Sequence, residues 1–237
     1  MFTFKAFRAV DEPEICDMFI EGHANVLKDY GVTKVTSSNN DWKFNPYVFV
    51  VTVHEDSTGK VVSGLRIHIA HEDFPLPMEG AIAPVDSKIF ELVKGYRING
   101  GTGEIGGLWN SRLISGYGIG AIFLSRTSLV IAEQLNVPSL FALCAEYTLK
   151  PTLQKGFEIE ENIGNKGTFF YPKLDLVATL AVLKDVKNLP VALPVERDFI
   201  LELRENLDCS RMENTLKGPV EITYQLKIKN PDWRKNA

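Results

Sequence analysis

The feature that most limits what this chain can fold into is the run of residues 104–145. Residues 104–110 predict a strand with two glycines inside it, and residues 119–135 predict a long apolar helix. Residues 139–145 form a continuous apolar run, which is typical of a central parallel strand. A strand, a helical crossover and a second strand in the same sheet make the two strands parallel. We therefore expect a β-α-β unit at the centre of the fold.

The residues on either side of this unit predict further strands and helices. An alternating pattern at 2–10 predicts a strand, and an acidic, proline-containing start at 11–14 predicts a helix that ends at Gly31. The remaining patterns predict a β-hairpin from 47–53 and 61–70, a proline-rich loop at 71–84, helices at 86–96, 147–155 and 195–206, and strands at 157–160, 167–171, 174–183 and 220–228.

Composition excludes several classes of protein. The 237 residues are 45% hydrophobic and 24% charged, as in globular domains, and the net charge of −4 argues against nucleic-acid binding. No apolar stretch is long enough to span a membrane, and the N-terminus lacks a signal-peptide pattern. We expect one cytoplasmic domain, residues 1–237, with a core at 1–185, a C-terminal extension of unclear role at 186–237, and no membrane contact.

The cysteines point in the same direction. Cys16, Cys144 and Cys209 are odd in number and far apart, which argues against a disulfide framework and a cysteine-based zinc site. Cys144 lies in an apolar strand pattern, so we interpret it as a small buried thiol rather than a nucleophile. His68 and His71 have no acidic partner pattern, and we predict no metal.

The glycine-rich turn at 115–121 indicates an anion site. Its sequence, Ser-Gly-Tyr-Gly-Ile-Gly-Ala, lies between a predicted strand and a predicted helix. Glycines allow unusual backbone dihedrals and a close ligand approach, and a helix N-terminus offers unpaired N–H groups to a phosphate. No Gly-Lys-Ser/Thr follows, as a Walker loop requires, and the glycine spacing does not match the dinucleotide-binding pattern. An ordinary tight turn is the alternative interpretation.

Two segments together resemble the acyl-CoA motif of GNAT N-acetyltransferases. They are Glu-Ile-Gly-Gly-Leu-Trp-Asn at 104–110 and the glycine-rich turn at 115–121. That family has an acidic residue on its fourth strand, a bulged strand end, and a Q/R-x-x-G-x-G/A turn that opens a helix. Gly118 and Gly120 match the two glycine positions of that turn. The resemblance covers residues 104–157 and implies an α/β (α+β) fold, with a mixed, mostly antiparallel sheet, one central parallel strand pair and helices on both faces.

The resemblance also implies a function and a site. It implies transfer of an acetyl or other acyl group from acyl-CoA, the co-substrate, to a small-molecule amine. Glu104 is the implied general base, with a solvated acid at a strand end as the alternative, and Tyr147 is the nearest candidate acid, although we favour a packing aromatic there. The implied cofactor-binding residues are Leu108, Trp109, Asn110, Gly116, Tyr117, Gly118, Ile119, Gly120 and Ala121.

Three residues depart from the GNAT pattern. Ser115 stands where the family has Gln or Arg, Thr152 where many members have a catalytic tyrosine, and Ala145 where asparagine is common. These departures keep open a CoA-binding regulatory protein without catalysis.

A second resemblance, to acyl-homoserine-lactone synthases and N-acyl amino acid synthases, rests on residues 61–67, Met78 and 103–105. It implies longer acyl chains and acyl carrier protein as a candidate donor. Arg66 could then hold an acceptor carboxylate, although we favour a surface arginine. A homodimer is a further candidate arrangement.

Overall fold

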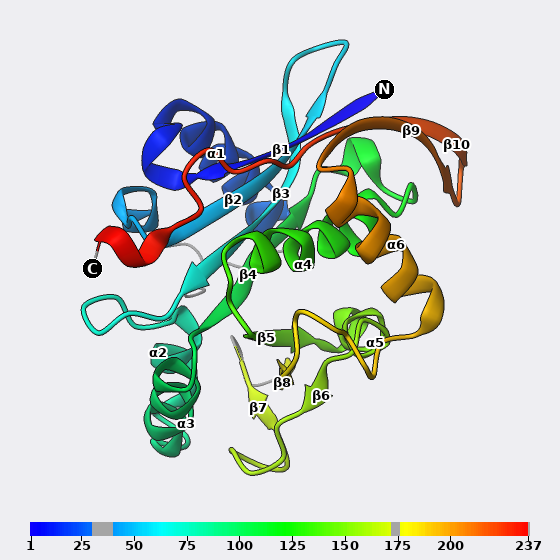
Figure 1. Ribbon diagram of the computed structural model, residues 1–237. Helices are drawn as coiled ribbons and strands as arrows, with labels where there is room; N and C mark the ends of the chain where they lie inside the picture. Colours follow the sequence, from blue (N-terminus) through cyan, green and yellow to red (C-terminus); the bar gives the residue numbers. More distant parts are fainter. Residues whose placement is uncertain (30–39, 172–175, 237) are drawn as a thin grey trace.

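The computed structural model describes residues 1–29, 40–171 and 176–236 (Figure 1). A sheet of ten strands runs through these residues in the order β6-β8-β5-β4-β3-β2-β1-β10-β9, with β7 paired to β8. The strands are β1 (Phe2–Arg8), β2 (Val48–Glu55), β3 (Val61–Ile69), β4 (Thr102–Asn110), β5 (Ser139–Ala145), β6 (Glu158–Ile159), β7 (Thr168–Phe170), β8 (Val177–Leu183), β9 (Asp208–Thr215) and β10 (Gly218–Gln225).

Helices cover both faces of this sheet (Figure 1). On one face, α1 packs on an apolar cluster that contains Phe19, and α2 and α3 pack on a second cluster that contains Met78. On the other face, η5, α4, α5 and α6 pack on the largest cluster. The helical segments are η1 (Ala9–Asp11), α1 (Pro13–Asp29), η3 (Asp41–Phe44), α2 (Pro77–Ile82), α3 (Lys88–Ile98), η4 (Arg112–Ile114), the π-helical η5 (Ile119–Leu124), α4 (Ser125–Gln134), α5 (Glu146–Gln154), α6 (Pro194–Glu205) and η6 (Trp233–Asn236).

The predicted β-α-β unit is confirmed. β4 and β5 are parallel, with Thr102 opposite Ser139, and η5 with α4 forms the crossover between them. β1 and β2, β2 and β3, β3 and β4, and β5 and β8 are antiparallel, so the predicted fold class is confirmed. The sheet contains a second parallel pair that the sequence did not predict, between β1 and β10.

Two other details differ from the prediction. Residues 77–82, expected in a loop, form the short helix α2. Pro77 stands in its first turn, where the missing N–H costs nothing, and the Glu79 carboxylate accepts a hydrogen bond of 2.6 Å from the Leu76 N–H. The strand β9 was not predicted at all. The predicted end of the first helix, at Gly31, lies outside the described residues.

The C-terminal segment is joined to the rest by side chains as well as by β10. The Arg126 guanidinium on α4 donates two hydrogen bonds, of 2.8 and 2.7 Å, to the Glu196 carboxylate on α6. The Trp233 indole N–H donates to the Leu135 carbonyl at 2.9 Å. Within the described ranges, no helix has both the length and the apolar content needed to cross a bilayer.

Candidate functional site

The central parallel pair separates where the glycines of β4 begin. β4 and β5 are paired from Thr102 and Ser139 as far as Ile105 and Ala142, and beyond these residues no pairing continues between them. β4 runs on to Asn110 and β5 to Ala145. The facing edges of the two strands therefore present backbone groups that the sheet does not use.

A β-bulge lies on the β4 side of this opening. Gly64 of β3 is opposite Trp109 and Arg66 is opposite Gly106, so β4 has one more residue than β3 between these pairs. Gly107 has a φ of +60°, a backbone conformation that favours glycine, and it lies just beyond the last pair between β4 and β5. The bulged strand end that the resemblance implied is therefore present at the two glycines of β4.

Glu104 lies just before the opening and is buried, with 6% of its surface exposed, so it is not a solvated acid at a strand end. One carboxylate oxygen accepts a 2.8 Å hydrogen bond from the Met78 N–H in the first turn of α2. The other lies 3.5 Å from the point where a Cβ on Gly106 would stand, and therefore faces the bulge. Burial raises the pKa of Glu104 to about 7, although the Met78 N–H and the Arg66 charge oppose the rise.

Arg66 on β3 is buried, with 2% exposed, so the prediction of a surface arginine is wrong. Its guanidinium carbon lies 4.5 Å from the centre of the Trp42 ring, which is a cation–π geometry. A Cβ on Gly107 would stand 2.6 Å from the Arg66 Nε, so the bulge glycine leaves room for the guanidinium. Burial lowers the pKa of Arg66 to about 10, opposed by the Glu104 carboxylate, and the side chain keeps its charge at neutral pH.

His68 pairs with Glu104 across β3 and β4 and is 7% exposed. Side chains directly opposite in an antiparallel pair share one face of the sheet. Burial and the Arg66 charge hold the pKa of His68 well below its usual value, so the ring is neutral. Its Nε2 has no hydrogen-bond partner among the described residues. Sequence reasoning considered His68 only as a metal ligand and did not associate it with Glu104.

The predicted ligand-binding residues of β4 lie in three different environments. The Leu108 side chain packs against the large cluster below α4. Trp109 is buried against Phe19 of α1, with ring centres 5.7 Å apart, so only its backbone is available beside the opening. The Asn110 amide oxygen accepts a 2.6 Å hydrogen bond from the Ser63 hydroxyl.

The glycine turn joins the end of β4 to η5. Gly116 and Gly118 have φ values of +81° and +72°, so both positions favour glycine. The helix begins at Ile119 and continues through η5 into α4, as predicted. Its first N–H groups have no acceptor within the helix and point back toward the turn.

Gly120 serves a different purpose from Gly118. Its φ is not positive, and a Cβ there would overlap the side-chain amide of Asn110. Gly120 therefore lets η5 pack closely on the end of β4. Ala121 follows in η5, and its side chain lies outside the described part of the chain.

The helix α5 begins directly after β5, on the other side of the opening. Tyr147 in its first turn is 85% exposed, so the prediction of a packing aromatic at this position is wrong. The Thr152 hydroxyl donates to the Thr148 carbonyl at 2.8 Å. Cys144 at the end of β5 is 4% exposed, and burial raises the pKa of its thiol, as expected for an unreactive cysteine.

Iodoacetamide is therefore expected to alkylate Cys209 first in the native protein. Cys209 is half-buried, whereas Cys16 and Cys144 are buried, and burial raises the pKa of Cys16 to about 12. Peptide mapping by mass spectrometry after brief labelling at pH 8 would measure the order, with urea-unfolded protein as the control. Rapid labelling of Cys144 would contradict the interpretation of this thiol as unreactive.

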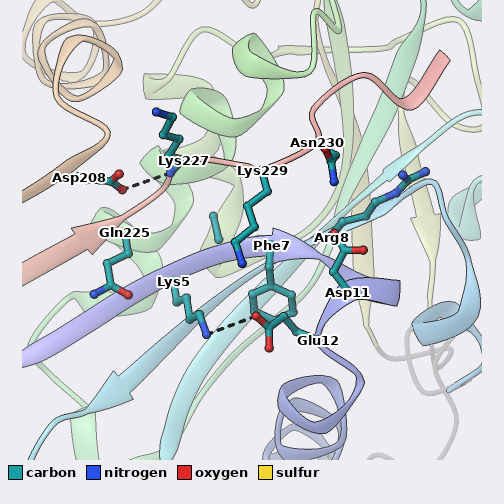
Figure 2. Close-up of a pocket in the computed structure, with 11 residues that line it drawn as sticks. Lys5, Phe7, Arg8, Asp11, Glu12, Asp208, Gln225, Lys227, Lys229 and Asn230 are labelled. Atoms are coloured by element: carbon teal, nitrogen blue, oxygen red, sulfur yellow. Dashed lines mark hydrogen bonds and ion pairs between the residues drawn. The ribbon is translucent and has the colours of Figure 1, made fainter. Parts of the chain in front are cut away.

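A cavity of about 640 Å³ lies elsewhere, where the second parallel pair separates (Figure 2). β1 and β10 are paired only as far as Lys5 and Gln225, and the cavity continues between Arg8 and Lys229. Because β1 runs antiparallel to β4, this cavity lies at the opposite end of the sheet from the glycine turn. Its lining mixes cations with acids, including an ion pair of 3.6 Å between Lys5 and Glu12, and holds none of the predicted site residues.

Comparison with solved structures shows which proteins share this fold. FeeM, an N-acyl amino acid synthase from uncultured soil microbes, is 13% identical with a TM-score of 0.61, and the match covers 84% of this chain and 98% of FeeM. BjaI, a CoA-dependent acyl-homoserine lactone synthase solved with SAM and isopentyl-CoA, is 12% identical with a TM-score of 0.51. The match covers 86% of this chain and 90% of BjaI. An acyl-CoA N-acyltransferase from Pseudomonas aeruginosa is 12% identical with a TM-score of 0.50. The match covers 77% of this chain and 99% of the acyltransferase.

At these identities the likeness concerns the fold. The predicted fold is confirmed, and the chain shares it with these N-acyltransferase and synthase structures over most of its length. No protein-family model matches the sequence, and a search of curated proteins gave no match.

Proposed function

We propose that this protein is an N-acyltransferase that moves an acyl group from an acyl-CoA thioester to an amine. The observation that carries the proposal is the opening between β4 and β5, with a buried carboxylate of raised pKa at its base and a glycine turn at its outer end. A thioester arm lying along the opening would find unused backbone groups on β4, and its phosphates would meet the N–H groups at the start of η5.

The chemistry follows from these positions. Glu104 takes a proton from the attacking ammonium group, through a water where the reach requires one, and its pKa of about 7 suits a base that works near neutral pH. The amine then attacks the thioester carbonyl, and N–H groups of β4 between Leu108 and Asn110 stabilise the oxyanion. The carbon–sulfur bond breaks, the nitrogen loses its second proton to water as the amide forms, and the thiolate takes up a proton. Tyr147 is the candidate donor of that proton.

A second candidate within this class uses a longer acyl chain, carried by CoA or by acyl carrier protein. The specific observation in its favour is the fold match to FeeM, which has a higher TM-score than the matches to BjaI and the Pseudomonas acyltransferase. A protein that binds CoA without turnover is the alternative from another class.

Acyl-CoA is expected to bind with a dissociation constant in the micromolar range and to raise the melting temperature. Titration calorimetry with acetyl-, octanoyl- and palmitoyl-CoA would measure the affinity, and release of free thiol over a panel of amines and amino acids would measure turnover. Preference for the long chains would favour the synthase, and binding without turnover the regulatory protein. Absence of binding at millimolar ligand would refute the proposal.

A further inference from the structure

The glycine turn brings no charged side chain to the phosphates that it is proposed to hold. Residues 115–121 contain none. Arg112 lies just before the turn, but its Nε is 3.2 Å from the Asp29 carboxylate of α1, and most of its side chain is exposed. Backbone N–H groups alone would have to balance the charge of a pyrophosphate.

A lysine from the C-terminal segment lies against this turn. β9 and β10 form a hairpin in which Thr215 pairs with Gly218, so Leu216 and Lys217 make up its tip. The Thr215 hydroxyl donates to the Gly218 carbonyl at 2.6 Å and accepts from the Lys217 N–H at 3.2 Å. These two bonds hold the tip in a defined turn.

The tip and the glycine turn fit each other closely. The Lys217 Cε lies 2.9 Å from the point where a Cβ on Gly116 would stand, so the lysine stem passes directly over that glycine. The Lys217 ammonium lies 4.9 Å from the centre of the Tyr117 ring, and Tyr117 is in turn held edge-on by Phe2 of β1 at 6.2 Å. Among the described residues, no carboxylate lies within ion-pair distance of this ammonium.

We propose that Lys217 is the cationic phosphate contact of the acyl-CoA site, brought to the glycine turn by the C-terminal hairpin. This deepens the proposed function and rests on it. The ammonium is exposed, lies over the turn and can donate a hydrogen bond to a phosphate oxygen. Such a charge-assisted hydrogen bond is stronger than one between neutral groups. The proposal also assigns a role to residues 208–225, because their pairing with β1 places the tip at this end of the sheet.

The test compares Lys217→Glu with Lys229→Glu by titration calorimetry. Lys229 lines the cavity at the opposite end of the sheet, so its replacement makes the same change in net charge away from the turn. Lys217→Glu is expected to raise the dissociation constant of acetyl-CoA at least about tenfold, and Lys229→Glu less than about twofold. Lys217→Met, which keeps the stem over Gly116, separates the loss of charge from the loss of packing and is expected to weaken binding by an intermediate factor.

Acetyl-pantetheine, which lacks the phosphates, distinguishes the source of the effect. Turnover with this donor at a fixed high concentration is expected to be the same for the wild type and Lys217→Glu, and thermal melting checks that the variant is folded. Equal acetyl-CoA affinity in Lys217→Glu and Lys229→Glu would overturn the role of Lys217 but leave the proposed function intact. Failure of the wild type to bind acetyl-CoA would overturn the proposed function and the inference with it.

Discussion

Replacing Glu104 with glutamine is expected to lower turnover by a factor on the order of 10²–10⁴ while acyl-CoA still binds. The amide cannot accept the proton of the attacking ammonium, but its oxygen can still accept the hydrogen bond from the Met78 N–H. The carboxylate does not lie at the glycine turn, so the affinity for the donor is expected to change little. Initial rates and calorimetry on the same preparation would measure the two effects.

The pH profile gives this experiment its sharpest readout. In the wild type, turnover is expected to rise with pH through about 7, as Glu104 loses its proton, and the variant is expected to lack this limb. Glu72→Gln is a matched control, because Glu72 is an exposed carboxylate paired with Arg97 and removed from the opening. If Glu104→Gln turned over at the wild-type rate between pH 6 and 9, Glu104 would have only a structural role.

Replacing Arg66 with glutamine is expected to lower the free energy of unfolding by about 3 kcal/mol, because a buried charge that attracts the Glu104 carboxylate is removed. Three interactions are lost together: the electrostatic attraction to the Glu104 carboxylate, the contact with Trp42 and the filling of the space beside Gly107. The loss is limited because Glu104 can become neutral by taking up a proton. Urea denaturation would measure it, and Arg97→Gln, which breaks a surface ion pair, is expected to cost less than about 1 kcal/mol.

The same variant is expected to move the rate profile to higher pH. The Arg66 charge lowers the pKa of Glu104, so the pKa rises above 7 when that charge is removed. The raised pKa of Glu104 also makes the stability of the protein depend on pH.

The folded protein binds the Glu104 proton more tightly than an unfolded chain, in which the pKa is near 4.5. The contribution of Glu104 to stability therefore falls as pH rises from 4.5 to 7. In Arg66→Gln this fall should extend to higher pH, and an unshifted profile would show that the two groups are not coupled.

Local sequence patterns were sufficient to predict the central unit. Each part of this unit is visible in the residues next to one another in the sequence. The strand β4 with its two glycines, the helix from Ile119 and the apolar strand β5 were all predicted at nearly the observed positions. The helix α2 was missed because residues 71–84 contain three prolines and because its N-cap, Leu76, is not a residue that typically marks the start of a helix. β9 was missed because its largely exposed, polar sequence forms a strand only through its pairing with β10.

The environment of the site depends on contacts between distant segments, which the sequence does not reveal. Glu104 is an acid on a strand in any interpretation of the sequence, but its burial follows from the packing of α2 above it. Arg66 was judged a surface residue because its ring partner, Trp42, belongs to a separate segment of the chain. The contact between Lys217 and Gly116 joins residues that are far apart in sequence, and no local pattern predicts it.

The pairing of β1 with β10 also determines the order in which this protein can assemble. Phe2 is synthesised long before its partner on β10, which is Ile222. Until that part of the chain has been synthesised, β1 is an edge strand with open hydrogen-bonding groups and apolar side chains beneath it, a state in which strands join other chains. Contacts this far apart in sequence close slowly, because the loop entropy is lost before the pairing is gained. The last strands of the sheet therefore protect the first one, and a chain interrupted before residue 218 would be prone to aggregation even though its proposed catalytic centre was complete.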